Sequence, residues 1–454
     1  TLLPPPSSFT TATAASSFAS SKTKIDTTIS TIDILLSHAH SPPSPPPSTL
    51  FPTASVSSLL SPEGKLIVCA VSKPVNMSLA RGGYGWHFDR CSDMFTRALD
   101  ALSSSPLPER SNGANMGKGC VGSTRVEWVF MPSVEIKGSA VQSAMAQKLF
   151  EDFQSRPLFL PSEVRRKFGD ICARLWPVFH GIATDEYSSA SAKGTSWAGG
   201  GGRESMGSDA VAADMEGLDA YRVVSEHFAQ AVAGIYNPGD LILVYDFELL
   251  LLPQMLRRRI TDDATIGIFL DCPFPSPEFF RKIPVRSNLL RGVLESDLIL
   301  FHHFAHARNF NKTCAALLGV DSSAGGVRYN GRLISIQVCP LGVDPKLYSS
   351  SSPAVESSVA DLRSRLADYR VVSCIDALDP VKGLPQKLLA FEDFLRQNES
   401  FRKKVIFVVV IDRRPGLNHF WGRTRQLDKQ VNRLVGRING LFGTADYTPI
   451  QYMR

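Results

Sequence analysis

The sequence lacks any long hydrophobic run. No stretch approaches the roughly 20 apolar residues that a helix needs to span a bilayer, which argues against an integral membrane protein. The chain begins with Thr rather than Met, so the lack of a signal-peptide-like start carries little weight. The 454 residues have a net charge of only +6 and no basic run interleaved with aromatics, which argues against a nucleic-acid-binding protein.

Cysteine is scarce, and its spacing does not suggest a metal site. The eight cysteines form no CxxC pair, and several lie in apolar runs. They are Cys69, Cys91, Cys120, Cys172, Cys272, Cys314, Cys339 and Cys374. Reduced, buried thiols of this kind are typical of a cytoplasmic protein, and we expect this compartment.

Ordered structure is predicted to begin only after residue 60. Ser, Thr, Pro and Ala dominate residues 1–60, with runs such as SPPSPPPS. Such a segment buries too little apolar surface to offset its ordering entropy, so we expect a disordered extension. Polar, Gly-rich composition predicts two flexible insertions, near residues 103–122 and 188–217.

From Lys65 onward, short apolar runs alternate with segments of helical pattern. The predicted strands are 65–75, 125–131, 241–247, 265–270, 297–302, 334–340, 370–375 and 404–411. The predicted helices are 140–153, 218–236, 253–260, 278–296, 304–318, 356–368, 385–397 and 424–439. Apolar strands separated by helices are typical of α/β folds with parallel sheets covered on both faces. Two such sets predict two Rossmann-like domains, over 61–343 and 344–454.

Polar side chains follow several predicted strands at the point where each strand stops. They are Asp246, Asp271, His302 and His303 in the first set, and Asp376, Asp379, Lys382, Asp412, Arg413 and Arg414 in the second. Ligands of such folds bind at the carboxyl ends of the strands, so these residues mark a candidate site. An acid at a strand–helix junction is also a common helix N-cap, and both interpretations stay open.

Asp271 raises a question of its own. It follows the buried run 266–270 and enters a loop of Cys272, Pro273, Phe274 and Pro275. A carboxylate in such surroundings is costly unless it is paired or hydrogen-bonded. Either Asp271 does chemistry at the strand end, or it occupies a place where another residue did so.

Five runs resemble the trehalose-6-phosphate synthase family. They are LWPVFH (175–180), GDLILVYDFELLLLP (239–253), IGIFLDCPFPSPEFFRKIPVRSNLLRGVLESDLILFH (266–302), IDALDPVKG (375–383) and GRINGLFGTADYTPIQY (436–452). The similarity covers roughly residues 65–454, in the family's order. It implies a GT-B-like fold of two Rossmann-type domains. It also implies glucose transfer from UDP-glucose to glucose 6-phosphate, with no cofactor and no essential metal.

The resemblance assigns ligand roles to several residues of this chain. The matched positions are Trp176 and Asp246 on the acceptor side, Gly82, Gly83 and Lys382 on the donor side, and Arg414 or its neighbour Arg413. The acceptor-side pair is implied to contact the acceptor sugar, and the lysine to hold the donor diphosphate. The arginine is implied to clamp the acceptor phosphate. For the two glycines, ordinary turn positions are the alternative.

This sequence differs from the family at several of the family's functional positions. Ser72 and Lys167 stand where the family has a phosphate-binding arginine and a tyrosine, and segment 245–249 has lost both histidines of HDYHL. Asp271 occupies the place of the active-site histidine, and Ala377 that of the diphosphate-binding arginine. Fixed cations are the main electrostatic stabilisation of a departing diphosphate, so no catalytic position is expected to be intact.

The family's second domain continues beyond the PIQY run, whereas this sequence ends at Arg454. We therefore expect a partial second domain, in which the helices near 385–397 and 424–439 expose apolar faces.

Three hypotheses follow for the function. The preferred one is a catalytically impaired regulatory or scaffolding subunit of a trehalose synthase/phosphatase complex, with glucose 6-phosphate or UDP-glucose as ligands. The first alternative is an active retaining glucosyltransferase that makes trehalose 6-phosphate. The second is a sugar-phosphate-binding module without partners. None of the three involves nucleic acid or a membrane.

Overall fold

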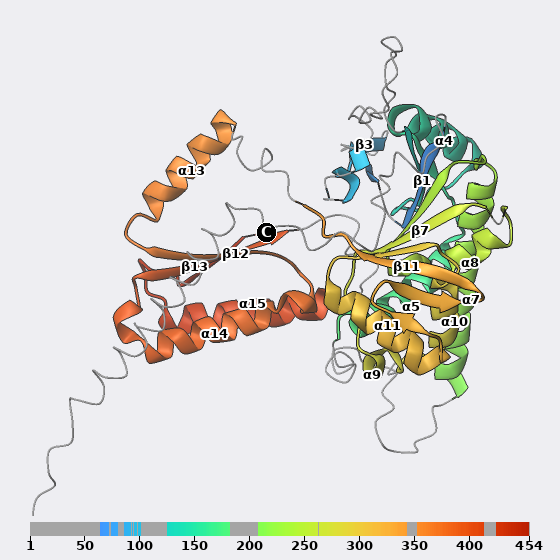
Figure 1. Ribbon diagram of the computed structural model, residues 1–454. Coiled ribbons are helices and arrows are strands. Elements are labelled where there is room, and N and C mark those ends of the chain that lie inside the picture. The colour runs from blue at the N-terminus through green and yellow to red at the C-terminus, as the bar shows by residue number, and fades with distance from the viewer. Residues whose placement is uncertain are drawn as a thin grey trace, which may run out of the picture. The chain divides into compact units, whose positions relative to one another are not determined.

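The fold was analysed in a computed structural model (Figure 1). The structure describes residues 64–71, 74–79, 86–91, 93, 95–97, 99–100, 125–181, 208–261, 263–342, 352–412 and 424–453. The predicted extension over 1–60 and the insertion near 103–122 lie outside these ranges. The second insertion ends earlier than predicted, because helix α7 (Ser208–Ala233) already begins at Ser208.

A nine-stranded sheet forms the first part of the described chain. Its order is β5 (Ser155–Pro157), β4 (Arg125–Met131), β1 (Lys65–Val71), β6 (Leu241–Tyr245), β7 (Thr265–Leu270), β8 (Leu298–Phe301), β11 (Arg332–Val338), β10 (Gly326–Tyr329) and β9 (Ser322–Ser323). Every pair from β5 to β11 is parallel, as predicted, while β10 and β9 add an antiparallel margin. The carboxyl ends of the parallel strands therefore share one edge.

Helices cover one face of this sheet (Figure 1). They are α5 (Ser162–Phe179), α7, α8 (Leu252–Arg257), α9 (Pro277–Phe280), α10 (Arg286–Val293) and α11 (Phe304–Leu318), while α4 (Ser139–Phe153) packs beside β5. In β1, Ile67 and Cys69 face this helical layer, while Leu66 and Val68 face a second cluster that includes Phe95. Burial on both faces explains why β1 reads as one apolar run.

One predicted helix is two. The segment 278–296 was expected to be continuous, but α9 ends at Phe280 and α10 begins at Arg286. Pro284 lies between them, and its ring disfavours a helical conformation at the preceding residue. The sequence pattern also missed α5 and the two-stranded sheet of β2 (Val75–Leu79) and β3 (Trp86–Arg90).

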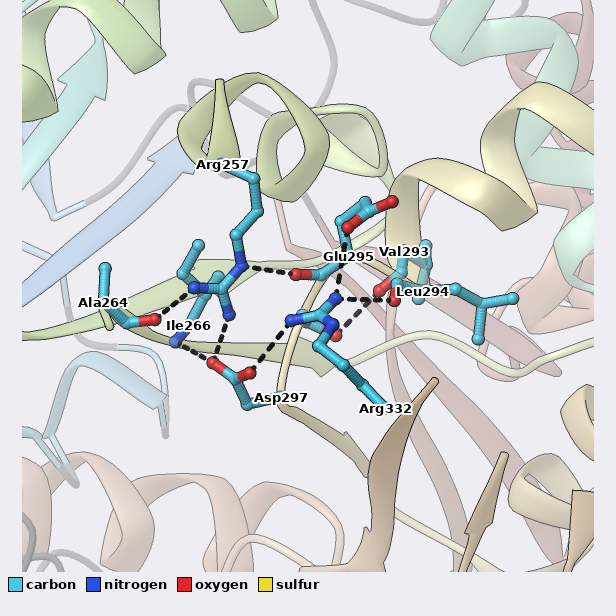
Figure 2. Close-up of polar contacts among 9 residues, drawn as sticks. Arg257, Ala264, Ile266, Val293, Leu294, Glu295, Asp297 and Arg332 are labelled. Atoms are coloured by element: carbon cyan, nitrogen blue, oxygen red, sulfur yellow. Dashed lines mark hydrogen bonds and ion pairs between the residues drawn. The ribbon is translucent and has the colours of Figure 1, made fainter. Parts of the chain in front are cut away.

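Ion pairs close the amino edge of the large sheet (Figure 2). Asp297 precedes β8 and accepts from Arg257 at 2.5 Å, from Arg332 at 3.3 Å and from the Ile266 amide at 2.8 Å. Arg332 also pairs with Glu295 at 3.1 Å. The network joins α8 to the starts of β7, β8 and β11, so its charges are satisfied within the fold.

Glu127 forms a second cluster at the same edge. Its side chain is fully buried in β4 and accepts from Lys65 at 2.7 Å and from Arg156. Burial raises the pKa of this carboxyl, but the hydrogen bonds and charges of the two cations outweigh burial and hold the pKa below its ordinary value of 4.5. Glu127 is thus an ionised, paired group that connects β1, β4 and β5.

The second part of the described chain contains a three-stranded parallel sheet. Its order is β12 (Arg370–Ala377), β13 (Val405–Asp412) and β14 (Ile450–Met453), with α13 (Pro353–Arg365), α14 (Leu384–Gln397) and α15 (Thr424–Phe442) beside it in the chain. The short 3-10 turns are η1 (Phe247–Leu249), η2 (Pro380–Lys382) and η3 (Glu399–Phe401).

The apolar exposure in this second part is not where we expected it. The predicted exposed helices, α14 and α15, bury Leu388 and Val431 against the sheet, and only single residues such as Leu441 stand open. Exposure is concentrated on α13 and β12 instead, with Val355 51% and Ile375 75% exposed. None of the helices in the described ranges is long and apolar enough to cross a membrane.

Candidate functional site at the strand ends

The sheet order brings the predicted strand-end residues together. Strands β6, β7 and β8 are consecutive neighbours, and Asp246, Asp271 and His302 each follow the last residue of one of them. Since parallel strands end at one edge, these three side chains lie where ligands of such folds bind. This grouping was predicted from the sequence alone.

Asp271 uses both of its carboxylate oxygens inside the fold. The Tyr245 hydroxyl donates to Oδ2, and His302 Nε2 contacts Oδ1. The carboxylate is thus paired with a nearby base, and it does not cap the following helix α9, which has Ser276 at its N-cap. The Asp271 and His302 side chains remain 27% and 29% exposed, so solvent or a ligand can reach them.

Tyr245 is the donor that fixes one side of Asp271. Burial raises the pKa of its hydroxyl, and the charges of Asp246 and Asp271 raise it further. The hydroxyl therefore keeps its proton and serves as a donor. The sequence pattern did not predict this role, because Tyr245 lies at the end of a buried strand, where an apolar residue is expected.

Asp246 has an unusual backbone conformation. Its φ of 63° and ψ of −178° lie in a region that glycine alone adopts readily, and its side chain accepts a 2.8 Å hydrogen bond from the Phe247 amide. The expected capping role of a strand-end acid is thus observed at η1. A strained residue at a strand end is a recognised sign of a functional position, since the fold must stabilise the strain elsewhere.

Cys272 lies among these acids. Burial raises the pKa of its thiol well above the ordinary value, and Asp246 adds to the shift through its charge and a hydrogen bond. Glu248 and Asp271 act in the same direction. The thiol therefore stays protonated and inert, and the expectation of buried, reduced cysteines holds at this position.

Trp176 lies near the end of α5, close to η1. Its ring packs against His180 at 3.7 Å between centroids and against Phe247 at 5.9 Å. His180 Nδ1 lies 2.9 Å from the Trp176 carbonyl, and burial lowers the pKa of the imidazole although this carbonyl opposes the shift. The structure thus places Trp176 next to the turn that carries Asp246, as the predicted acceptor-side pair requires.

One predicted donor-side residue, Lys382, lies in the segment that follows β12. Ala377 ends the strand, and Asp376 before it pairs with Lys387 at 2.7 Å. Asp379 accepts from the Val381 amide at 2.9 Å, so this acid stabilises the turn. Lys382 is exposed at the end of η2, immediately before Gly383 (φ 65°) and the start of α14.

Several predicted site residues lie outside the described ranges. They are Ser72, Gly82, Gly83, Arg413 and Arg414. Lys167, which stands in place of the family's tyrosine, is described on α5 and pairs with Glu163 at 3.1 Å. That surface pair lowers the pKa of the Glu163 carboxyl, first through the hydrogen bond from Lys167. The ligand roles of all these residues remain predictions.

Comparison with known proteins agrees with the fold and with the family resemblance. The model of Glycosyltransferase family 20 matches residues 205–454, more than half of the chain. An alpha,alpha-trehalose-phosphate synthase [UDP-forming] 2 of Aspergillus niger is 32% identical over 403 residues, 87% of this chain and 74% of the relative.

Two solved structures share the architecture. The N-terminal domain of Candida albicans trehalose-6-phosphate phosphatase is 25% identical, with a TM-score of 0.66 over 86% of this chain and 72% of that one. A structure described as trehalose-6-phosphate from E. coli bound with UDP-2-fluoro glucose is 20% identical, with a TM-score of 0.62 over 86% and 73%. The fold is therefore GT-B, and the chain belongs to glycosyltransferase family 20, the family of the trehalose-6-phosphate synthases.

Proposed function

We propose that this chain is a cytoplasmic, catalytically impaired member of its family, acting as a regulatory or scaffolding subunit of a trehalose synthase/phosphatase complex. In this role the fold serves to bind partner subunits and sugar ligands rather than to transfer glucose. The proposal involves no metal ion and no cofactor.

The observation that carries the proposal is the bonding of Asp271. The resemblance puts this residue where the family has its active-site histidine, and its carboxylate accepts from both Tyr245 and His302. A carboxylate held in this way can neither donate a proton nor supply positive charge. Transfer from UDP-glucose leaves negative charge on the diphosphate, which needs fixed cations or donors rather than another anion.

The donor side supports the same proposal. Ala377 has no polar side chain at the position implied for a diphosphate-binding arginine. Loss of one such donor typically lowers the rate by about 100- to 1000-fold. Lys382 remains exposed before the amino end of α14, where a helix terminus favours anions, so weak donor binding is expected to persist.

One structural relative supports a role other than glucose transfer. The Candida albicans neighbour is named as part of a trehalose-6-phosphate phosphatase, so this fold occurs in a protein named for a different activity. By analogy, we propose that this chain also works next to a phosphatase activity.

The active transferase remains the second candidate, because Trp176 and Asp246 are retained on the acceptor side. Asp246 keeps its strained backbone, and Trp176 packs on the turn beside it. The resemblance assigns both of these residues to the acceptor sugar. The Aspergillus niger relative is named a synthase, which favours this candidate too.

A release assay separates the two candidates. The full chain is incubated with UDP-glucose and glucose 6-phosphate, and UDP release is measured, with the Aspergillus niger synthase as positive control. We expect no release above the blank, and weak binding of UDP-glucose by isothermal titration. Turnover by the full chain would overturn the impaired role. Addition of this chain should in turn change the activity or assembly of a synthase/phosphatase mixture.

A restoring variant tests the physical reason. Asp271→His together with Ala377→Arg should raise the affinity for UDP-glucose, because an anion is removed and a cation is added. Asp361→His with Ala377→Arg is the matched control, since Asp361 lies exposed on α13 in a pair with Arg365. Equal affinities of the two double variants would show that Asp271 does not limit donor binding.

A further inference from the structure

Four neighbouring strand ends of the large sheet are joined by one chain of hydrogen bonds. Tyr245 ends β6, Asp271 follows β7, His302 follows β8, and Leu341 follows β11. Tyr245 and His302 both contact the Asp271 carboxylate, and the Leu341 amide nitrogen lies 3.4 Å from His302 Nδ1. These strands are consecutive in the sheet, so the row of hydrogen bonds crosses the carboxyl edge without a gap.

We propose that Tyr245, Asp271, His302 and the Leu341 amide form a brace across this edge, and that protonation of His302 opens its last link. The brace does not depend on whether the chain transfers glucose. It concerns how the fold holds the segment that leaves the large sheet.

The partners of His302 determine where its proton lies. The Leu341 amide can only donate, so Nδ1 must be an unprotonated acceptor. The Asp271 carboxylate is an acceptor, so Nε2 must carry the proton. Only the neutral imidazole with hydrogen on Nε2 satisfies both contacts.

A second proton on the ring affects the two contacts in opposite ways. Protonated Nδ1 faces the Leu341 N–H with hydrogen against hydrogen, so that bond is lost. The contact with Asp271 becomes a charge-assisted pair and strengthens. At 3.4 Å, the bond from the Leu341 amide to His302 is also the longest of the three bonds in the brace, so it is the bond that opens.

Several charged and titratable groups lie around His302. The Asp271 carboxylate contacts its Nε2, and the buried Tyr245 hydroxyl remains a neutral donor to that carboxylate. On α11, which begins after the capping His303, burial and the charges of His303 and His302 lower the pKa of His306. A further described neighbour is the uncharged Phe269 ring, whose centroid lies 5.0 Å from that of the imidazole.

Leu341 is a position at which such a link matters. The Cys339 amide donates to the Phe301 carbonyl at 2.8 Å, which ties the end of β11 to β8. Leu341 itself packs against the cluster that includes Tyr245 and Phe269. Beyond it, the chain continues toward α13 and the second sheet. The brace therefore holds the exit segment 339–342 on the large sheet at neutral pH and loosens it on acidification.

Residue-resolved NMR on the full chain, labelled with ¹⁵N-histidine and ¹⁵N-leucine, tests the brace. We expect His302 to show the Nε2–H tautomer at neutral pH. As the pH falls through the His302 titration, amide exchange of Leu341, divided by its intrinsic rate at each pH, should rise about 3- to 10-fold. The opposite tautomer would overturn the proposal. So would a Leu341 exchange ratio that stays constant as the pH falls.

Two variants separate titration from general loosening. His302→Gln keeps a donor for Asp271 but cannot titrate, so the Leu341 exchange ratio should lose its pH dependence. His227→Gln is the control, because His227 is exposed on α7 and contacts only its own helix in the described bonds, through the Val223 carbonyl at 2.8 Å. An unchanged pH dependence in His302→Gln would contradict the brace.

A third variant keeps the test decisive if His302→Gln fails to fold. Tyr245→Phe removes the second donor to Asp271, which makes the carboxylate a stronger partner for the imidazolium. The NMR titration midpoint of His302 should therefore rise, while that of His227 should stay constant. An unchanged His302 midpoint would show that Tyr245 does not act through Asp271.

Discussion

The two edges of the large sheet hold their acids in different ways. At the amino edge, Glu127 and Asp297 each face two cationic side chains. At the carboxyl edge, the described partners of Asp246 are a backbone amide and a thiol, and Asp271 has a hydroxyl and an imidazole. The described partners include cations at the amino edge, and a backbone amide, a thiol, a hydroxyl and an imidazole at the carboxyl edge.

This difference separates stability from recognition. Acids paired with two cations have little left to offer a ligand, and removal of such an acid leaves its cations without a partner. Acids held by neutral donors keep their charge and part of their exposure, which suits sugar hydroxyls and opposes phosphates. We therefore expect the amino edge to matter for stability and the carboxyl edge for ligand binding.

The largest expected effect is at Glu127. Glu127→Gln removes the charge that compensates Lys65, whose side chain is only 11% exposed. The free energy of unfolding should fall by about 3 kcal/mol, because a buried cation loses its partner. Urea denaturation at pH 7 measures this loss. Asp170→Asn on α5 breaks only an exposed pair with Arg166 and should cost less than about 0.5 kcal/mol.

The same substitution predicts a pH dependence. The pKa of Glu127 is depressed by folding, so its contribution is complete above the ordinary value of 4.5 and is lost as the pH falls through the lower folded value. Wild-type stability should therefore decline below pH 4.5 more steeply than that of Glu127→Gln. Parallel curves for the two proteins would contradict the assigned role of Glu127.

The next largest effect is expected at Asp297. Asp297→Asn places an amide group against Arg257 and Arg332 and weakens the network in Figure 2. The Asp297 side chain is 38% exposed, so the loss should be smaller than at Glu127, about 1–2 kcal/mol by urea denaturation. A loss equal to that of Glu127→Gln would remove the distinction between a half-exposed and a buried cluster.

A matched pair at Asp246 measures backbone strain. Asp246→Ala and Asp246→Gly both remove the side-chain bond to the Phe247 amide, but only glycine adopts φ 63° and ψ −178° without strain. The glycine variant should be more stable than the alanine variant by about 1–2 kcal/mol in thermal unfolding. Equal stabilities would mean that the backbone relaxes in the alanine variant and that no strain is stored.

The smallest stability effect is expected at Asp271. Asp271→Asn keeps an acceptor for Tyr245 in a partly exposed place, so the cost should stay below about 1 kcal/mol. Binding of glucose 6-phosphate, followed by isothermal titration, should nevertheless become tighter as the anion is removed. Asp297→Asn is the same chemical change at the opposite edge and should leave binding unaltered. A reversed pattern would invalidate the comparison of the two edges.

Local pattern predicted most of the fold because the strands of the large sheet are buried on both faces. Strand β7 and helix α11 match their predicted bounds to the residue. Predicted elements were wrong where a helix-breaking residue or tertiary packing outweighed the hydrophobic pattern. Pro284, between α9 and α10, is one such residue. The apolar exposure expected on α14 and α15 was wrong for a similar reason, since those two helices pack on the second sheet.

The sequence by itself determined the order of strands and helices, the family resemblance and the strand-end positions of Asp246, Asp271 and His302. Only the tertiary structure decided what holds these side chains. Tyr245 reaches Asp271, and Leu341 reaches His302, because sheet order places the ends of β6, β7, β8 and β11 next to one another. Hydrogen bonds between residues 26 and 39 positions apart leave no periodic trace in the sequence, so local reasoning could not find them.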